Sequence, residues 1–576
     1  MLNLDMARIF DEIADILELK GENPFRIRAY RRAARTIETL TQDLKVIAER
    51  GGVDELRKIP GIGEGIAKKI VEIAQTGDCE KHQALMREVS AGLLELLSIP
   101  RVGPKTIAKV HQELGINSVE DLEAAAKAHK LAGIPGLGAK AEENILKGIE
   151  QYRGYKGRVL LYNALPYAES IVNELKKLAA VERITVAGSL RRMRETIGDI
   201  DILVVSKRPK EVMDAFTSLE GVEDVLAKGE TKSAVIIRGI NADVRVVDAA
   251  SFGAAAHYFT GSKQHNIRIR ELGVKKGLKI NEYGVFRGEE RIGGENEEDV
   301  FKSVGLAYIP PELREDRGEV EAAKENRIPR LVEIRDLKGD LHVHTRWSDG
   351  KNSVEEMAKS ALGLGYEYIA VTDHSPAVGI AGGLTEDEIA ERQEEIVKAN
   401  EQFESEGTRF RVLDSVEVDI KSDFSMDFPD AILKDFDLVV GAIHTKFTQD
   451  RETMTNRIIG AMENPNVDII AHPTGRLLGK RDPYEVDMEK LMEAAKRTGT
   501  ILELNSFPDR LDLNDLHCKM AKGYGVLVAI STDAHDALQM RDVIRYGVAT
   551  ARRGWLEAKD VVNTRGLEDM RKVLKG

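Results

Sequence analysis

Seven short apolar runs, separated by longer segments with helical spacing, dominate the sequence from residue 340 to residue 535. Alternation of this kind is typical of a parallel sheet whose strands are joined by crossover helices. In a β/α barrel the C-terminal ends of the strands converge on one face, so the last residues of the runs are expected to meet in space. The runs are DLHVHT, YIAVTDH, FRVLDSVEVDI, DLVVGAIHT, VDIIAHP, TILELNS and VLVAISTDAH.

Nitrogen and oxygen ligands gather at or near the ends of these runs. They comprise six of the chain's 12 histidines and three acids. One histidine in such a place is more often structural, but nine such residues at corresponding places predict a site for about three divalent ions. The set contains no thiolate, so Mn²⁺, Zn²⁺ and Fe²⁺ all suit it. The predicted ligands are His342, His344, Asp349, His374, Glu417, His444, His472, Asp533 and His535.

A second acidic pattern lies in VAGSLRRMRETIGDIDILVV, residues 186–205. The part IGDIDILV alternates strictly, so on a strand Asp199 and Asp201 project from one face. Further on, KSAVIIRGINADVRVVD predicts a hairpin whose second strand carries Asp243. Three such carboxylates suit two Mg²⁺ or Mn²⁺ ions about 3.5 to 4 Å apart, as nucleotidyl transfer requires. The residues expected to hold the phosphates beside them are Gly188, Ser189 and Arg192.

Residues 1–150 show helical spacing throughout, and one phrase occurs in them three times, as IPGIGEGIAKKI, IPRVGPKTIAKV and IPGLGAKAEENI. Each copy predicts a tight glycine turn that opens a helix and offers backbone N–H groups to a phosphate. The net charge of −13 argues against a nucleic-acid partner, but residues 20–35 hold six basic residues and one acidic residue. Since local charge matters more than the sum, we expect DNA binding here. The turn residues expected to contact DNA are Gly61, Gly63, Gly103, Lys105, Gly136 and Gly138.

The motifs GSLRRMRETIGDIDILV, ADVRVVD and YFTGSKQHNIRIR resemble the palm and thumb of family X DNA polymerases, the group of DNA polymerase beta. The resemblance covers residues 1 to about 315. It implies that Asp199, Asp201 and Asp243 are the catalytic metal ligands, and that the YFTG backbone excludes a 2′-hydroxyl group. The implied nucleotide-binding residues are Gly188, Ser189, Arg192, Tyr258, Phe259, Gly261, Asn266 and Arg270.

The N-terminal helices are similar to that family's DNA-end-binding domain and to helix-hairpin-helix motifs, which would also bind Na⁺ or K⁺. The resemblance places Arg26 and Tyr30 in a phosphate pocket and Lys69 where some members carry a Schiff-base lysine that removes a 5′-deoxyribose phosphate. Gly65 replaces an expected phosphate-binding lysine, and Phe25 replaces a frequent histidine. A solvated lysine therefore remains the alternative to a lyase role for Lys69.

The nine ligands at the strand ends resemble, in order and spacing, the PHP domain shared by polymerases and histidinol phosphatases. The resemblance implies a trinuclear site in which Glu417 bridges two ions, and Asp349 replaces the histidine of some relatives. Such a site supports hydrolysis of a phosphoester. On the same chain as a polymerase, it implies a 3′-5′ exonuclease, and possible substrates also include abasic sites cut by an AP endonuclease.

The expected fold class is multidomain, with an all-α helix-hairpin-helix N-terminal domain, an α/β (α+β) nucleotidyltransferase palm with a thumb, and a C-terminal distorted (β/α)7 barrel of the PHP type. The expected domains are a DNA-end-binding domain at 1–90, a fingers-like helical domain at 91–155, the palm at 156–255, a thumb-like nucleotide-selection subdomain at 256–315, a solvated linker at 316–336 and the PHP domain at 337–576.

Together these features predict a template-directed DNA polymerase that fills short gaps in DNA repair, including base excision repair, and trims 3′-ends. Its expected partners are gapped or primer-template DNA and dNTPs. Three alternatives remain open: a phosphoesterase acting on sugar phosphates such as histidinol phosphate, a PHP nuclease whose polymerase half only binds DNA ends, and an RNA-tailing transferase. With two cysteines, Cys79 and Cys518, and no long apolar run, we expect a cytoplasmic monomer without a membrane partner.

Overall fold

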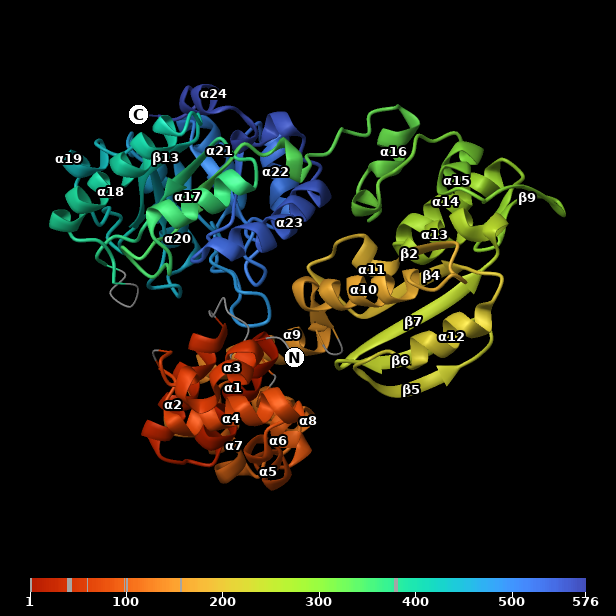
Figure 1. The fold of residues 1–576 in the computed structure, drawn as a ribbon, viewed down its shortest axis with the longest axis horizontal. Coiled ribbons are helices and arrows are strands. Elements are labelled where there is room, and N and C mark those ends of the chain that lie inside the picture. Colours follow the sequence, from red (N-terminus) through yellow and green to blue (C-terminus); the bar gives the residue numbers. More distant parts are fainter. Residues whose placement is uncertain are drawn as a thin grey trace. The chain divides into compact units, whose positions relative to one another are not determined.

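The computed structural model describes residues 3–38, 44–59, 61–97, 99, 102–155, 158–377 and 382–575. The chain forms two compact units, and each is described by itself. The first comprises Met1–Lys156 with Gly479–Arg481, and the second comprises Gly157–Leu478 with Asp482–Gly576. Figure 1 labels their helices and strands. Within the described ranges, the helices are all too short or too polar to span a bilayer.

The described part of the first unit is helical, as its three- and four-residue spacing predicts. One apolar cluster centres on Phe10, Ile13 and Ile70, and a second on Ile107 and Leu122. The helices are α1 (Asn3–Leu19), α2 (Pro24–Glu38), α3 (Leu44–Leu56), α4 (Glu64–Thr76), α5 (Glu80–Glu88), α6 (Ala91–Leu97), α7 (Pro104–Leu114), α8 (Val119–Lys127) and α9 (Ala139–Tyr155), with a 3-10 turn at Leu131–Gly133.

The palm of the second unit is built on a five-stranded sheet with the order β2-β4-β7-β6-β5, in which β4 and β7 run parallel. Helices α10 and α12 cover one face, where Leu165, Val212 and Phe216 are buried (Figure 1). The elements are β1 (Val159–Leu160), α10 (Leu161–Lys176), β2 (Arg183–Val186), α11 (Gly188–Arg191), β3 (Thr196–Ile197), β4 (Asp199–Val205), α12 (Pro209–Thr217), β5 (Val222–Lys228), β6 (Lys232–Ile237) and β7 (Ile240–Val247).

The thumb follows the palm directly and combines helices with a small antiparallel sheet of order β10-β9-β8. Its apolar core includes Ile269, Val285 and Phe301. The elements are a 3-10 turn at Ala249–Ser251, α13 (Phe252–Thr260), α14 (Lys263–Lys275), β8 (Lys279–Asn281), β9 (Gly284–Arg287), β10 (Glu290–Gly293), α15 (Glu297–Val304) and a 3-10 turn at Pro311–Leu313.

The predicted linker at 316–336 combines exposed residues, such as Glu325 and Arg330, with a short helix and a few buried residues. Helix α16 (Glu319–Lys324) buries Val320 and Ala323, and Leu331 is also buried. Nη1 of Arg317 lies 2.9 Å from Oδ2 of Asp515 in the barrel. The dense mixed charge of the segment concealed its few apolar residues, which are enough to pack it against its neighbours.

The C-terminal part is a seven-stranded parallel sheet in chain order, β11 to β17, which confirms the predicted (β/α)7 architecture. A parallel bridge from Val343 to Ala534 brings the last strand back to the first. The elements are a 3-10 turn at Ile334–Asp336, β11 (Gly339–Val343), α17 (Val354–Gly363), β12 (Tyr368–Val371), α18 (Glu386–Ser405), β13 (Arg411–Asp419), α19 (Asp430–Leu433), β14 (Leu438–Ala442), α20 (Arg451–Glu463), β15 (Ile469–Ile470), α21 (Met488–Thr498), β16 (Ile501–Asn505), α22 (Asp515–Tyr524), β17 (Val528–Ser531), α23 (Ala537–Arg553), 3-10 turns at Ala558–Asp560 and Val562–Thr564, and α24 (Leu567–Arg571).

Candidate active sites

The three predicted carboxylates of the palm lie on the two parallel strands at the centre of its sheet. Asp199 and Asp201 are on β4, and Asp243 is the direct neighbour of Asp201 on β7. Ile200, between the two acids of β4, enters the core, as strict alternation predicts. Gly188 approaches from the turn after β2 with a φ of +61°, and a Cβ there would lie 2.6 Å from Oδ2 of Asp201. The glycine is therefore required for the turn to reach the acids.

The electrostatics of this cluster fit divalent cations. Burial, followed by the carboxylates of Asp199 and Asp243, raises the pKa of Asp201 to about 6. Nζ of Lys232 lies 3.0 Å and Nη2 of Arg245 lies 4.0 Å from Oδ2 of Asp243. These two cations offset only part of the repulsion, so the carboxylates form a natural site for metal ions.

Sequence reasoning overlooked Lys232. The hairpin pairs Ile237 with Ile240, and counting back along this ladder sets Lys232 opposite Arg245. The short turn between β6 and β7 was therefore the signal that could have identified this lysine.

Replacing Asp201 with asparagine is expected to stabilise the metal-free protein. Because folding raises the pKa of this group from 3.8 to about 6, its contribution to stability is complete below pH 3.8 and is lost as the pH rises through 6. At pH 7.5 the charge then costs on the order of 2 kcal/mol. In EDTA at pH 7.5, the D201N variant should therefore melt at a higher temperature than the wild type.

The gap between the two melting temperatures should narrow as the pH approaches 5. Asp224→Asn provides the control, because Asp224 is exposed on the edge strand β5. Equal melting temperatures of D201N and wild type at pH 7.5 would show that the carboxylates do not repel one another in the fold.

The predicted triphosphate-binding arginine is enclosed rather than projecting freely. Arg192, just after α11, is 9% exposed, and its Nε donates to Oε1 of Glu315 at 3.0 Å. Its Nη1 donates to the carbonyl of Thr260, which joins the palm to the YFTG turn of the thumb. Sequence reasoning overlooked Glu315, because 123 residues separate it from Arg192.

Four of the other predicted nucleotide-binding residues lie on α13 and α14. Tyr258 is 37% exposed, and its carbonyl accepts a hydrogen bond from Nδ2 of Asn266 at 2.7 Å. The guanidinium carbon of Arg245 lies over the ring of Phe259, 4.7 Å from the ring centroid. Nε of the exposed Arg270 donates to the carbonyl of Asn266. The remaining two predicted residues here are Ser189, which is half-buried on α11, and Gly261, which caps α13 with a φ of +69°.

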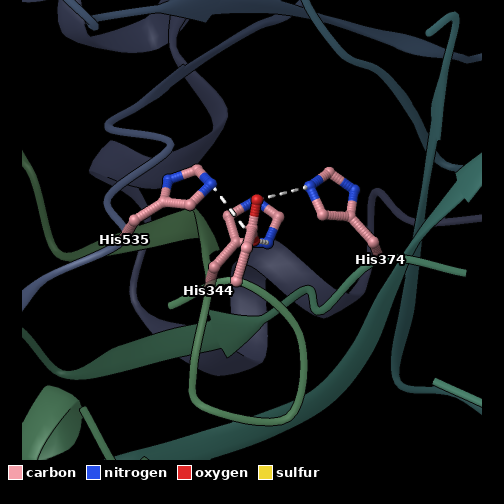
Figure 2. Close-up of side chains that lie close together, drawn as sticks. His344, His374 and His535 are labelled. Carbon is pink, nitrogen blue, oxygen red and sulfur yellow. Dashed lines mark ion pairs between the residues drawn. The ribbon is translucent and has the colours of Figure 1, made fainter. Parts of the chain in front are cut away.

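The nine predicted ligands of the barrel converge at the C-terminal ends of its strands. Nε2 of His342 lies 3.1 Å from Nε2 of His344, which lies 3.2 Å from Oδ1 of Asp533. His374, His535 and His344 turn their rings toward one point in Figure 2. Donor atoms that lie within 4.8 Å of one another form three groups: His344, Asp349, His374 and His535; His342, His344 and Asp533; and His374, Glu417 and His444.

Among the nine predicted ligands, Glu417 contacts histidines from several strands of the barrel. Its Oε1 lies 3.1 Å from Nε2 of His472 and 3.4 Å from Nε2 of His444, and its Oε2 lies 2.8 Å from Nδ1 of His374. Although burial alone would raise the pKa of Glu417, the imidazole groups of His374, His444 and His342 hold it well below its usual range. A carboxylate that stays charged at full burial is suited to bridging cations.

Residues behind the ligands orient them. Nδ1 of His342 donates to Glu503 at 2.7 Å, Nδ1 of His444 contacts Asp419 at 3.2 Å, and Asn505 donates to Asp533 at 3.0 Å. Nε of Arg510 lies 3.5 Å from Oδ2 of Asp533 and brings a positive charge to the same place. Sequence reasoning overlooked all four, although Glu503 and Asn505 stand at the end of one of the seven runs.

The donor set therefore fits divalent metal ions. Nε2 of His342 faces Nε2 of His344 at 3.1 Å, and the same nitrogen of His344 lies 3.2 Å from the buried carboxylate of Asp533. Imidazole donors that are oriented by carboxylates behind them are typical of metal centres. Eight of the nine predicted ligands fall into the three donor groups, and His472 joins them through its contact with Glu417, while their binding of metal ions stays a prediction.

The three glycine turns of the first unit share one geometry. The N–H groups of Ile62, Val102 and Leu137 each donate to the carbonyl three residues before, at 3.1, 3.2 and 2.9 Å. Gly63 and Gly103 then cap α4 and α7, while Gly61 and Gly136 have φ values of +88° and +84°. Gly138 leads into α9 in the third copy, and Lys105 lies in the first turn of α7 with 82% of its side chain exposed. The turns thus present helix N-termini, as predicted.

The candidate lyase residues lie on neighbouring helices without a direct contact in the described residues. Lys69, on α4, places Nζ 3.3 Å from the carbonyl of Gly65. Tyr30 is 7% exposed and stacks on Phe10, whereas Arg26 is more exposed and lies 3.7 Å from Glu22. Cys79 and Cys518 are both buried thiols.

Comparison with known proteins shows what each part of the chain is similar to. Matches to sequence families comprise a helix-hairpin-helix domain at residues 1–79, a SAM-like helix-hairpin-helix tandem at 93–151, the DNA polymerase beta thumb at 255–315 and the PHP domain at 340–507. The chain is 39% identical over 576 residues to the DNA polymerase/3′-5′ exonuclease PolX of Bacillus subtilis (strain 168), with 99% of each chain covered. A probable phosphatase of Thermoanaerobacter sp. (strain X514) is 32% identical over 207 residues, which are 34% of this chain and 78% of that one.

Proposed function

Because this chain belongs to the PolX family of DNA polymerase/3′-5′ exonucleases, we propose that it extends DNA primers at the palm and removes nucleotides from 3′-ends at the barrel. One observation carries the proposal: the same chain holds the in-register acids of β4 and β7 and a cluster of histidine and carboxylate donors suited to metal ions. The three glycine turns add a means of holding DNA by its phosphates.

At the palm, Asp199, Asp201 and Asp243 would hold two Mg²⁺ or Mn²⁺ ions. Such ions would lower the pKa of the primer 3′-hydroxyl and neutralise the triphosphate. The backbone at Gly188 and Ser189, together with Arg192, would bind the triphosphate. Tyr258, Phe259 and Gly261 would line the sugar pocket, and Asn266 and Arg270 would contact the incoming base and the template.

At the barrel, the nine ligands would hold about three ions, with Mn²⁺, Zn²⁺ and Fe²⁺ as candidates. Such ions would activate water and polarise a phosphodiester. Glu417 would lie between two of them, since it contacts three imidazoles with two oxygens. Arg510, whose guanidinium group lies beside Asp533, would hold the charged phosphodiester in place.

The first unit would bind the 5′-phosphate side of a short gap. We expect a one-nucleotide gap with a 5′-phosphate to be filled about tenfold more efficiently than the same gap with a 5′-hydroxyl, since charged hydrogen bonds contribute 1.5 to 3 kcal/mol each. Arg26→Ala should remove most of that preference, and Arg50→Ala, at an exposed position on α3, should retain it. Equal rates on both gaps with the wild type would argue against gap recognition.

Lyase activity at Lys69 is a further part of the proposal. Reduction with borohydride should trap the wild type on DNA that carries a 5′-deoxyribose phosphate, and Lys69→Ala should lose the adduct. Lys68→Ala is the matched control, because Lys68 is the neighbouring lysine and pairs with Glu64. If Lys69→Ala formed the adduct in the same yield as the wild type, Lys69 would be an ordinary solvated lysine without a lyase role.

The biological setting belongs to the same proposal: short-gap repair, including base excision repair, by a cytoplasmic monomer that also cuts abasic sites. The similarity of 207 residues of the chain to a probable phosphatase supports small phosphate esters as a second substrate class. Turnover of histidinol phosphate, measured beside release of nucleotides from a 3′-end, distinguishes the two.

A further inference from the structure

One arginine of the barrel reaches the nucleotide-binding turn of the palm. Arg553, the last residue of α23, has a side chain that is 5% exposed, and its Nη1 donates to the backbone carbonyl of Arg192 at 2.8 Å. The same nitrogen donates to Oε1 of Glu315 at 3.1 Å, while Nη2 donates to Oδ2 of Asp515 at 2.7 Å. The family resemblance assigns nothing to Arg553, Glu315 or Asp515.

Glu315 is the centre of this contact. The side chain of Glu315 is 8% exposed. Its carboxylate oxygens lie 3.0 Å from Nε of Arg192, 3.1 Å from Nη1 of Arg553 and 3.5 Å from Nη1 of Arg194. Burial opposes the charged form, but the guanidinium groups of Arg192 and Arg553 hold the pKa of Glu315 below its usual range. Three guanidinium groups therefore share one buried carboxylate.

We propose that Arg553 is a positioning residue for nucleotide incorporation and acts through Glu315 and Arg192. The inference rests on the proposed role of Arg192 as a ligand of the triphosphate. A triphosphate must draw Arg192 away from Glu315, and a buried carboxylate that loses its partner costs free energy. Arg553 remains as a second partner, so Glu315 stays paired when Arg192 turns to the nucleotide.

Without Arg553, Glu315 would hold Arg192 more tightly and compete with the triphosphate. The carbonyl of Arg192 would also lose the hydrogen bond that fixes the end of α11. Both effects weaken nucleotide binding in the ground state, and neither touches the three acids that hold the metal ions. The expected signature is therefore a higher KM for dNTP with little change in kcat.

The neighbouring arginine provides a matched control. Nε of Arg552 donates to Glu312 at 2.8 Å and its Nη1 donates to the carbonyl of Val332 at 3.1 Å, so it makes the same kind of contact between segments without reaching Arg192. The metal ligand His535 lies just before the other end of α23, whose 17 residues span about 25 Å. Hydrolysis of 3′-ends therefore reports whether the barrel is intact.

The test is steady-state incorporation of one nucleotide, with KM for dNTP, kcat and 3′-end hydrolysis measured for each full-length variant. Arg553→Gln should raise KM about tenfold, the equivalent of 1.4 kcal/mol, with kcat and hydrolysis near wild type. Arg552→Gln should change none of the three. In a Glu315→Gln background, Arg553→Gln should raise KM far less, because the competing carboxylate is gone.

If Arg553→Gln fails to fold, Arg553→Lys serves as the second variant. It keeps the positive charge and should raise KM by less than the tenfold expected for Arg553→Gln. An unchanged KM, a parallel loss of incorporation and hydrolysis, or an equal effect in the Glu315→Gln background would overturn the inference. A wild type that hydrolyses 3′-ends but incorporates no nucleotide would instead overturn the proposed polymerase function, and the inference with it.

Discussion

Replacing Asp201 with asparagine is expected to lower nucleotide incorporation roughly a thousandfold while 3′-end hydrolysis continues at the wild-type rate. Asp201 is the middle acid of the palm, with Asp199 on its own strand and Asp243 beside it on β7. Loss of its charge would remove one of the three carboxylates that would hold the two metal ions. Single-turnover incorporation on a gapped template measures the effect.

Asp248→Asn is the matched control, because Asp248 is exposed and follows the end of β7. It should leave incorporation unchanged. If D201N incorporated nucleotides at the wild-type rate, the acids of β4 and β7 would not be the polymerase centre.

Replacing Glu417 with glutamine should have the opposite effect, with hydrolysis lowered roughly a thousandfold and incorporation retained. A neutral amide in place of this carboxylate would remove the charge that lies among His374, His444 and His472. The variant should also bind fewer divalent ions per chain, as elemental analysis would show.

Glu394→Gln provides the control for the second centre, since Glu394 lies on the outer helix α18 with 74% of its side chain exposed. If Glu417→Gln hydrolysed 3′-ends at the wild-type rate and had a normal metal content, the nine predicted ligands would not form the exonuclease site.

The features that the sequence predicted well share a short-range pattern. Alternation in IGDIDILV set Asp199 and Asp201 on one face of β4, and the hairpin after it brought Asp243 beside them. The nine barrel ligands lie near the ends of apolar runs, and parallel strands bring such ends together whatever their separation in sequence. Both sites could therefore be predicted from local patterns: alternation fixes which side chains share a face of a strand, and parallel topology fixes the end at which the strands meet.

The features that sequence reasoning missed depend on distant packing. Glu315 meets Arg192 across 123 residues, and Arg553 meets Arg192 across 361 residues. No local pattern relates such positions, so the sequence did not reveal that carboxylate and carbonyl groups enclose Arg192. The buried residues of the segment 316–336 were missed for the same reason, since the neighbours that bury them are not revealed by the local sequence.

The central claim, that one chain extends and shortens the same DNA strand at two centres, is tested most directly with a 5′-labelled primer on a gapped template in Mn²⁺. We predict that the wild type lengthens the primer when dNTPs are present and shortens it stepwise when they are absent. D201N should only shorten it, and Glu417→Gln should only lengthen it. Loss of both activities in either single variant, or no change in primer length with the wild type, would contradict the account.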